Sequence, residues 1–345
     1  MSTTMSDIAA RAGTSVAAVS VALNGARSKT VKLSEDTRER ILRAANELGY
    51  RRNPHAGALA TGRSKVVGLM LPSASSYADH DPFFWLFTTG VAAAAARRGY
   101  NLMLYSANSE NGPAQIDRFV AGLVFVSPPT EAAMYAECDR QRIPYVSVFG
   151  DPAEARLTVG SSDREGGLMA TRHLLQQGHR RIAHLRGREE IRTTHPRQQG
   201  YEDALHEAGI GVDETLIQPG DFNRLTGFMS TKALMALPGS RRPTAIFACN
   251  DLAAHGAMEA IAEAGLRIPE DVAVVGYDDT WFATVVQPAL TSVDMDVLGL
   301  GDRAADLVLD AIEGQFTDAG QVVLPVRLTV RESSGAQMSG PMEGS

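Results

Sequence analysis

The sequence predicts an α/β protein with a small helical head and a larger core of two doubly wound lobes. Three observations predict this fold class. The first fifty residues carry helix start and stop signals without a strand pattern. From Lys65 onward, continuous apolar runs suited to buried parallel strands alternate with helical stretches. The alternation begins again after Val159, so we expect two parallel sheets with helices on both faces.

The head begins with two predicted helices. Thr4 is placed to cap the first helix, and Asp7 completes a capping box whose carboxylate also favours the positive end of the helix dipole. Gly13 can adopt the left-handed conformation that ends a helix, and Ser15 can cap a second helix two residues later. Two helices joined by such a tight turn have helix-turn-helix spacing.

The second helix has two distinct faces. Val19 and Leu23 lie four residues apart and are expected to face the first helix. The opposite face would enter a DNA major groove. It carries Val16, Ala17, Ser20, Val21 and Asn24. Many small amphipathic helix pairs share this pattern, so a purely structural pair is the alternative at this point.

A third helix and a short fourth segment complete the head. Ser34 is a good N-cap for the third helix, and Gly49 stops it. The segment Asn53–Gly62 carries further helix start and stop signals, but a helix shorter than roughly 12 residues is marginal alone. We expect it to form when two copies pack on DNA and insert Leu59 into a minor-groove base step; a flexible linker is the alternative. DNA contacts are expected from Asn53, His55 and Leu59.

The core strands are predicted from apolar runs. The first lobe should contain Val66–Leu71, Asn101–Ser106, Gly122–Val126 and Pro144–Val148. The second lobe should contain Arg181–Leu185, Thr244–Ala248 and Val272–Tyr277. Ligands of such sheets bind beyond the carboxyl ends of the strands. The last residues, from Ser333, have a disordered composition.

Charge is divided unevenly along the chain. The net charge is -7, yet residues 1–65 hold eleven Lys or Arg against five Asp or Glu. The head therefore carries a surplus of six positive charges, and the remainder carries thirteen negative charges. This asymmetry fits a head that meets DNA phosphates and a body that does not bind nucleic acid by itself. A solvated charge bias is the alternative.

Composition also indicates a cytoplasmic location. The longest apolar stretches, such as Val91–Ala96, are far shorter than the roughly 18 residues of a membrane span. The N-terminus lacks the long apolar region of a secretory signal. Cys138 and Cys249 are far apart and lack metal-ligand spacing, so we expect buried thiols, with neither metal nor cofactor.

Several motifs occur in an order and spacing that are specific together. They include D-I-A-A-R-A-G-T-S, V-S-V-A-L-N-G, L-A-T-G-R-S, R-H-L-L-Q-Q-G-H-R-R-I-A, P-T-A-I-F-A-C-N-D and I-P-E-D-V-A-V-V-G-Y-D-D. Over nearly its whole length the chain resembles the lac-repressor (LacI/GalR) family of bacterial transcription regulators. The resemblance implies a headpiece, a hinge helix and a two-lobed periplasmic-binding-protein-like core of doubly wound parallel sheets.

The resemblance also implies domain boundaries. The head is 1–50 and the hinge 51–64; the first lobe is 65–161 plus 295–319, the second lobe is 162–290 plus 321–332, and the tail is 333–345. The chain should cross between the lobes near 160–163, 290–294 and 319–323. The last strand, Val322–Leu328, is then expected in the second lobe.

In the head, Val16, Ala17 and Val21 match the base-reading positions of the family, while Thr4, Ser15, Ser20 and Asn24 match phosphate-facing positions. The three reading positions offer neither a guanidinium nor a carboxamide, so they cannot form bidentate hydrogen bonds to guanine or adenine. We expect this face to read thymine methyl groups and groove shape, with further specificity from DNA deformation.

In the core, the resemblance implies an effector site. The matching positions are Phe83, Phe84, Arg197, Phe222, Asn250 and Asp278. Aromatic faces together with a bidentate donor, an amide and a carboxylate suit a sugar. The alternatives are helix-start core for the two neighbouring phenylalanines and a structural ion pair for the arginine and the aspartate. Phe149 stands where many members have a ligand-binding aspartate; Asp151 or Asp163 could compensate, or the ligand could be less hydroxylated.

The function implied is a transcriptional regulator, expected to be a repressor, that binds a pseudo-palindromic operator as a homodimer and responds to a small molecule. A sugar is the expected effector; a nucleobase or no ligand is the alternative. A transport-type sugar receptor is a rival, although the basic head and missing signal peptide count against it. An enzyme is a second rival, but no catalytic motif accompanies His173, His179, His184 and His195.

Overall fold

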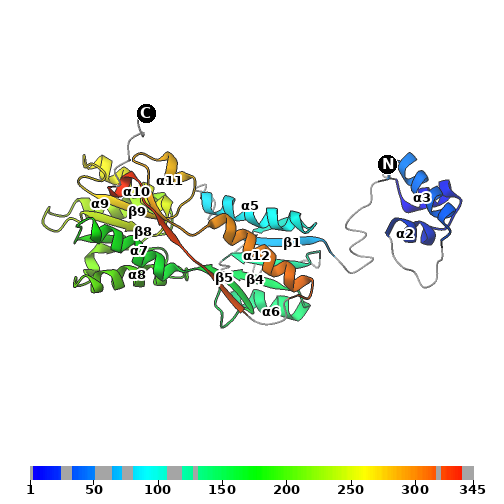
Figure 1. Cartoon of the computed structure of the whole chain (residues 1–345), viewed down its shortest axis with the longest axis horizontal. Helices are drawn as coiled ribbons and strands as arrows, with labels where there is room; N and C mark the ends of the chain where they lie inside the picture. Colours follow the sequence, from blue (N-terminus) through cyan, green and yellow to red (C-terminus); the bar gives the residue numbers. More distant parts are fainter. Residues whose placement is uncertain are drawn as a thin grey trace, which may run out of the picture. The chain divides into compact units, whose positions relative to one another are not determined.

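The computed structural model describes residues 3–24, 33–50, 64–71, 81–106, 119–126, 131–315 and 320–335. The chain divides into two compact units, Met1–Lys65 and Val66–Ser345 (Figure 1). The expected hinge helix, with Asn53, His55 and Leu59, lies outside the described residues. Within the described ranges, no helix combines the length and apolar character needed to cross a membrane.

The first unit contains three helices around one small core. They are α1 (Met5–Ala12), α2 (Val16–Asn24) and α3 (Glu35–Glu47). The predicted capping box is confirmed, because the Asp7 amide donates to Thr4 Oγ1 and the Thr4 amide donates to the Asp7 carboxylate at 2.8 Å. Gly13 has φ 62° and ends α1, also as predicted. Ile8, Val19 and Ile41 are fully buried where the three helices meet.

The first lobe is built on an all-parallel sheet in the order β11-β5-β4-β3-β1-β2. Its strands are β1 (Val66–Leu71), β2 (Asn101–Ser106), β3 (Gly122–Val126), β4 (Tyr145–Val148), β5 (Leu157–Ser161) and β11 (Gly320–Leu324). The four predicted strands are confirmed. Side chains of α5 (Pro82–Arg97) and α12 (Val297–Ile312) share one core with the sheet, and α6 (Glu131–Gln141) packs in a second cluster on it.

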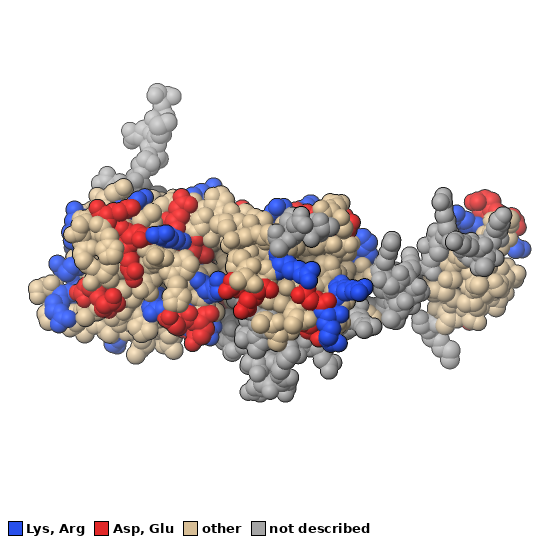
Figure 2. Space-filling view, turned by 90° about the horizontal axis from the view of Figure 1, so that it is seen from below, with Lys and Arg blue, Asp and Glu red and all other residues tan. Residues whose placement is uncertain are grey.

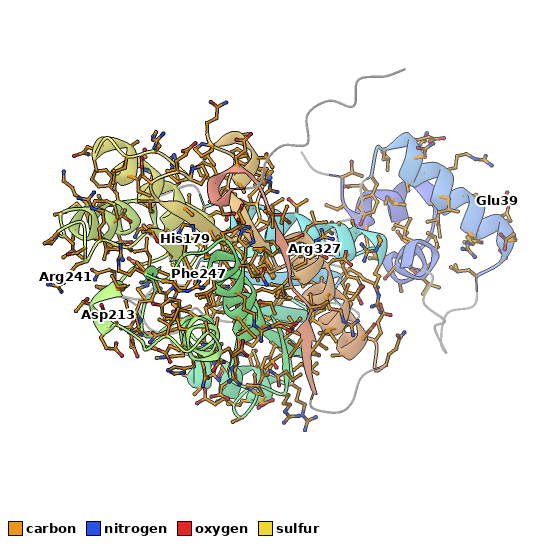
Figure 3. The ribbon with its side chains drawn as sticks, turned by 60° about the vertical axis from the view of Figure 1, so that its left-hand side comes forward. Glu39, His179, Asp213, Arg241, Phe247 and Arg327 are labelled. Carbon is orange, nitrogen blue, oxygen red and sulfur yellow. The ribbon has the colours of Figure 1, made fainter. Side chains whose placement is uncertain are left out.

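The second lobe has a sheet in the order β12-β10-β9-β8-β6-β7, parallel except for β12. Its strands are β6 (Ile182–Leu185), β7 (Ile217–Gln218), β8 (Ala245–Ala248), β9 (Ala273–Asp278), β10 (Thr291–Asp294) and β12 (Arg327–Thr329). Helices α7 (Asp163–Gln176) and α8 (Thr194–Glu207) pack in one cluster; α9 (Arg224–Met235), α10 (Asp251–Glu263) and α11 (Phe282–Val285) pack in another. Phe247 of β8 lies inside this lobe, while Arg241 lies at its rim (Figure 3). The three strands predicted here are confirmed.

Two details of the predicted lobe boundaries are wrong. Thr291–Asp294 was expected as a crossing, but it is β10 and pairs with β9, so the crossing follows it. The expected last strand, Val322–Leu328, is two strands: β11 pairs with β5 of the first sheet, and β12 pairs with β10 of the second. Pro325 interrupts the run, because proline cannot donate to a strand ladder.

The expected disordered tail also begins too early. Ser333 and Ser334 are buried in the 3-10 helix η3 (Glu332–Ser334) of the second lobe. Ser333 Oγ donates to the Val274 carbonyl at 2.6 Å and accepts from the Thr291 amide at 2.9 Å. These bonds satisfy polar groups near the starts of β9 and β10, which the composition alone does not reveal. Residues 336–345 lie outside the described residues.

Candidate functional site

The predicted DNA-reading face lies on the outer side of α2. Val16 is 47% exposed although it is apolar, and Ala17 is exposed beside it. Ser20 and Val21 are half-buried. Asn24 ends α2, Thr4 caps α1, and Ser15 accepts from the Ala18 amide at 3.2 Å as the cap of α2. The head thus presents a helix whose exposed face is apolar, while the face with Val19 and Leu23 packs in the core as predicted.

The core surface has a different charge pattern. Figure 2 shows acidic and basic side chains next to one another on the face in view, rather than in one basic field. Many form ion pairs, such as Arg98 with Asp310 at 2.6 Å and Arg97 with Asp302 at 2.6 Å. A surface of paired charges does not attract the DNA backbone strongly.

Four predicted effector residues gather at the carboxyl ends of the second sheet. Asn250 comes two residues after the end of β8, Asp278 ends β9, Phe222 follows β7, and Arg197 projects from α8. Parallel strands end at the same edge, so these loops meet there. Arg197, Asn250 and Asp278 are each at most 6% exposed. The sequence therefore predicted a real cluster of buried polar groups, although their contact with a ligand stays a prediction.

Arg197 is the centre of this cluster. Its Nε donates to Asp163 Oδ1 at 2.8 Å, and its Nη1 donates to the Cys249 carbonyl at 2.5 Å. A second carboxylate, Asp278, lies 3.9 Å from Nη1. The guanidinium also stacks on Tyr277, with its carbon 3.6 Å from the ring centroid. Such contacts fix the plane of the guanidinium. They confirm that Arg197 takes part in a structural ion pair, whereas its contact with a ligand stays a prediction.

The cluster contains two buried carboxyl groups and one guanidinium. Burial raises the pKa of Asp278 well above its usual value, and Arg197 only partly opposes this. Burial also raises the pKa of Asp163, again against the effect of Arg197. For Arg197, burial alone would lower the pKa, but the two carboxylates raise it, so the guanidinium stays charged. Two buried carboxyl groups sharing one cation have spare acceptor capacity, which hydroxyl donors of a ligand could satisfy.

Asn250 and Phe222 form one structural unit. Asn250 caps α10 by accepting from the Ala253 amide at 2.9 Å, and its Nδ2 donates to the Phe222 carbonyl at 2.9 Å. Phe222 has a left-handed backbone, φ 53°, and its ring lies over Gly187, where a Cβ would be 2.1 Å from the ring. Gly187 is thus required for the ring position. The side-chain amide of Asn250 therefore helps to position Phe222, the aromatic residue of the cluster.

The first lobe contributes a group of phenylalanine rings. Phe83 is only 9% exposed, and its ring centroid lies 5.2 Å from Phe84, 6.0 Å from Phe87 and 6.3 Å from Phe149. Phe83 therefore belongs to the core of this lobe, which agrees with its interpretation as a core residue at the start of a helix. Phe84 and Phe149 are half-buried against the same core. A ligand role for Phe83 and Phe84 stays a prediction.

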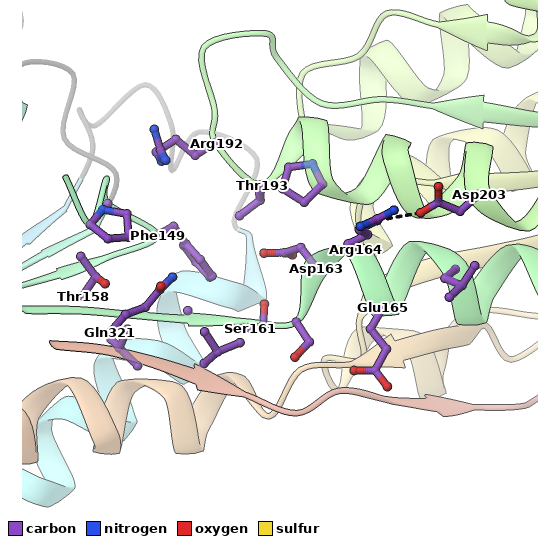
Figure 4. Close-up of a pocket in the computed structure, with 18 of the residues that line it drawn as sticks. Phe149, Thr158, Ser161, Asp163, Arg164, Glu165, Arg192, Thr193, Asp203 and Gln321 are labelled. Atoms are coloured by element: carbon purple, nitrogen blue, oxygen red, sulfur yellow. Dashed lines mark hydrogen bonds and ion pairs between the residues drawn. The ribbon is translucent and has the colours of Figure 1, made fainter. Parts of the chain in front are cut away.

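A cavity of about 840 Å³ lies at the junction of the lobes (Figure 4). Phe149 and Ser161 from the first lobe and Asp163, Arg192 and Thr193 from the second line it. None of the six predicted effector residues lines it, but Asp163 bonds Arg197 and Phe149 packs on Phe83. The cavity therefore adjoins the predicted cluster.

Sequence reasoning missed Arg192, Thr193 and Tyr277, and it named Asp163 only as a substitute acceptor. Arg192 donates across the lobes to Asp151 at 2.8 Å. Tyr277 directly precedes Asp278, and Asp163 is the first residue of a helix that follows a strand. These two positions could have identified Tyr277 and Asp163 from the sequence, because ligand-binding groups gather at the ends of parallel strands and at helix starts.

Comparison with known proteins places the whole chain. Residues 4–53 match the model for bacterial regulatory proteins of the lacI family, and residues 171–334 match a periplasmic binding protein-like domain. The HTH-type transcriptional regulator CelR of Thermobifida fusca is 34% identical over 340 residues, which cover 96% of this chain and 98% of that protein. A solved transcriptional regulator CelR–cellobiose complex is 32% identical with TM-score 0.70, covering 96% of this chain and 99% of that one.

The lac repressor dimer bound to operator and the anti-inducer ONPF is 26% identical with TM-score 0.81, and the match covers 97% of this chain and 99% of that one. These matches run from the head through both lobes, so they include α2 and the polar cluster. The chain therefore belongs to the lacI family of bacterial regulatory proteins.

Proposed function

We propose that this protein is a transcriptional repressor whose affinity for operator DNA is controlled by a neutral sugar bound between the two lobes. The observation that carries the proposal is the buried Arg197, held by Asp163 and close to Asp278, at the carboxyl ends of the second sheet. Such a cluster is costly unless something uses its acceptors and donors. Sugar hydroxyls both donate and accept, and the apolar face of a sugar ring packs on aromatic side chains.

The relatives support the same ligand class and assembly. CelR has been solved with cellobiose, and the lac repressor has been solved as a dimer on its operator. By analogy we propose that this chain forms a homodimer and binds a pseudo-palindromic site, because a two-fold dimer presents two identical reading helices. The reading helices would be α2 of each copy, through Val16, Ala17 and Val21.

The proposed control is a linkage between two sites. A ligand that touches both lobes favours one lobe orientation over another, and it changes DNA affinity only by its differential affinity for the two orientations. The Arg192–Asp151 ion pair spans the lobes at 2.8 Å, so at least one side-chain contact differs in energy between lobe orientations. Coupling energies of this kind are typically about 1–3 kcal/mol.

Phe149 alters the ligand chemistry relative to family members with an aspartate at this position. Its ring offers no acceptor, so the polar contacts of a ligand must come mainly from the second lobe. Asp163 and Asp278 are the buried carboxyl groups placed to accept hydroxyl protons there. Nucleobases are the competing ligand class, because flat rings also pack on phenylalanine.

The test uses the full-length protein and DNA from its own upstream region. Neutral sugars and nucleobases are screened by thermal shift, and each hit is added to a fluorescence-anisotropy titration of the DNA. We expect a sugar to raise the melting temperature and to change DNA affinity by about fivefold or more. If only nucleobases bind, the sugar assignment is wrong; if the protein ignores the DNA with and without every compound, the regulator model fails.

Variants then locate the site. Asp278→Asn should weaken binding of the sugar by about tenfold or more, since a buried acceptor becomes partly a donor. Its DNA affinity without sugar should stay within about twofold. Asp271→Asn is the matched control, because Asp271 lies at the surface in an ion pair with Arg267. An equal loss in both variants would place the sugar elsewhere.

A further inference from the structure

The cavity beside the polar cluster is bounded by one face of β11, which is the edge strand of the first sheet, and of its neighbour β5. Thr158 of β5 lies opposite Gln321 of β11, and Gly160 lies opposite Val323. Partners in a parallel pair project to the same face, as do residues two apart, so these four positions share one face of the sheet. All four line the cavity. Helix α6 packs on this sheet through a cluster that contains Met134 and Tyr135. Among the described residues, this cluster includes none from β5 or β11, so α6 does not cover these two strands.

Thr158 points to a ligand at this face. Its side chain is only 3% exposed, and its Oγ1 has no hydrogen-bond partner among the residues that the structure describes. Ser147, its register neighbour on β4, accepts a hydrogen bond from the Tyr135 hydroxyl at 2.5 Å. A buried hydroxyl without a partner has lost its hydrogen bonds to water, so a partner supplied by a ligand is favourable.

The shape of the cavity continues from the predicted site. A Cβ at Gly160 would lie 3.3 Å from the Phe149 ring, so this ring rests on β5 and forms one end of the cavity. Asp163 lines the cavity and bonds Arg197 through Oδ1. Figure 4 shows Phe149, Asp163, Ser161 and Thr193 around the same space. A ligand held by Arg197 could therefore extend past Asp163 toward Thr158 and Gln321.

Charge in the wall argues for a neutral occupant. Arg164 is paired with Asp203 at 2.6 Å, and Arg192 is paired with Asp151 at 2.8 Å. Each arginine of the wall thus already has a carboxylate. A phosphate or carboxylate ligand would have to break one of these pairs, whereas a hydroxylated ligand would not. Thr158, Ser161 and Gln321 offer hydroxyl and amide groups, which suit sugar hydroxyls.

We propose that this cavity is a second sugar subsite, so that the effector is a neutral disaccharide or longer oligosaccharide rather than a monosaccharide. One ring occupies the cluster around Arg197, and the next ring lies against β5 and β11, with a hydroxyl bonded to Thr158. The proposal rests on the proposed function. A volume of about 840 Å³ lies toward the upper end of the roughly 300–1,000 Å³ of ordinary ligand sites, which exceeds the need of one ring.

The experiment measures binding of matched sugars to the full-length protein by isothermal titration calorimetry. Glucose, galactose and xylose are compared with cellobiose, lactose and xylobiose. At least one disaccharide should bind about tenfold or more tightly than its component monosaccharides. Thr158→Val removes one hydroxyl at constant shape, and Gln321→Trp fills the cavity from an exposed position. Both should remove most of that advantage and leave monosaccharide affinity within about twofold.

Thr231→Val is the matched control, because Thr231 is also fully buried with an unpartnered Oγ1 but lies on α9, away from the cavity lining. Thermal unfolding of every variant checks the fold. If disaccharides and monosaccharides bind equally, or if the Thr158 and Gln321 variants keep the full disaccharide advantage, the subsite is refuted while a sugar-responsive regulator stands. If no sugar binds, both proposals fall.

Discussion

His184 illustrates how one buried residue can set the pH response of a lobe. It lies in the centre of β6, stacked on Phe247 at 4.8 Å and on Tyr201 at 5.3 Å between ring centroids. Nδ1 bonds the Phe247 carbonyl at 3.1 Å, which is possible only if Nδ1 carries the proton. Burial lowers the pKa of His184 to about 4. The histidine is therefore a neutral core residue.

The first prediction concerns stability against pH. The unfolded chain takes up a proton at His184 near pH 6.5, whereas the folded chain does so only near pH 4. The free energy of unfolding should therefore fall as the pH drops from about 6.5 to about 4, by up to about 3 kcal/mol from this residue. Denaturant unfolding followed by tryptophan fluorescence measures this free energy. Both tryptophans, Trp85 and Trp281, lie in the second unit, Val66–Ser345, which also contains His184.

His184→Phe keeps the aromatic stack and should flatten that decline. His173, His179 and His255 also have pKa values lowered by burial, so part of the pH dependence should remain. The control is His195→Phe, because His195 is exposed. An unchanged pH dependence in His184→Phe would mean that the folded protein protonates this ring readily.

At the scale of elements, three helix pairs are joined by reciprocal glycines. A Cβ at Gly90 of α5 would lie 2.1 Å from a carbonyl oxygen of α12, and a Cβ at Gly301 of α12 would lie 2.2 Å from the Phe87 carbonyl oxygen of α5. The pairs α7–α8 and α9–α10 each show the same arrangement. Gly167 approaches the backbone of Arg197, so in α7–α8 the close crossing also sets the position of the polar cluster.

The second prediction follows from this crossing. Gly301→Ala should destabilise the protein by about 1–3 kcal/mol, because the obstructing atom is backbone and the helices must move apart. The better helix propensity of alanine offsets only about 0.5–1 kcal/mol of this. Gly211→Ala is the control, since a Cβ there meets nothing within 4 Å. Thermal unfolding should show a lower melting temperature for the first variant alone; equal melting temperatures would contradict the close-packing argument.

Elements with local signals could be predicted from the sequence. The caps Thr4 and Ser34 and the apolar strands were found because capping geometry and buried strands depend on neighbouring residues. Pairing between distant segments could not be read in this way. The run Val322–Leu328 divides between two sheets, and the subsite residues Thr158 and Gln321 meet only because β5 pairs with β11. Arg197 was predicted from the family resemblance, with an ion pair to Asp278 as the alternative. Its contacts with Asp163, the Cys249 carbonyl and Tyr277 were not predicted, because they join distant segments.

At the scale of the whole molecule, the proposed control of DNA affinity requires the two lobes to change orientation. The contact that most directly bears on this is the ion pair of Arg192 with Asp151, whose side chains are 48% and 31% exposed. Exposed pairs contribute only about 0–1 kcal/mol, so this one can bias the lobe orientation without locking it. A weak bias suits a regulator, since a small ligand must be able to overcome it.

The third prediction tests that bias. Arg192→Glu places two like charges across the cleft and should favour a more open arrangement of the lobes. The affinity for a bridging sugar should then fall by about two- to fivefold, because binding must first restore closure. Salt should reduce the difference, since exposed charges are screened. The measurement is calorimetric sugar binding at low and high ionic strength, with small-angle X-ray scattering of the unliganded protein.

The charge-reversed double variant separates orientation from direct ligand contact. If the ion pair acts only between the lobes, Arg192→Glu combined with Asp151→Arg should recover most of the lost sugar affinity, because an attractive pair is restored with its order reversed. If instead Arg192 touches the ligand, the double variant should bind as weakly as Arg192→Glu alone. Arg188→Glu is the control, because Arg188 pairs with Asp221 inside the second lobe at 2.6 Å. An equal effect there would attribute the loss to net charge and remove the ion pair from the mechanism.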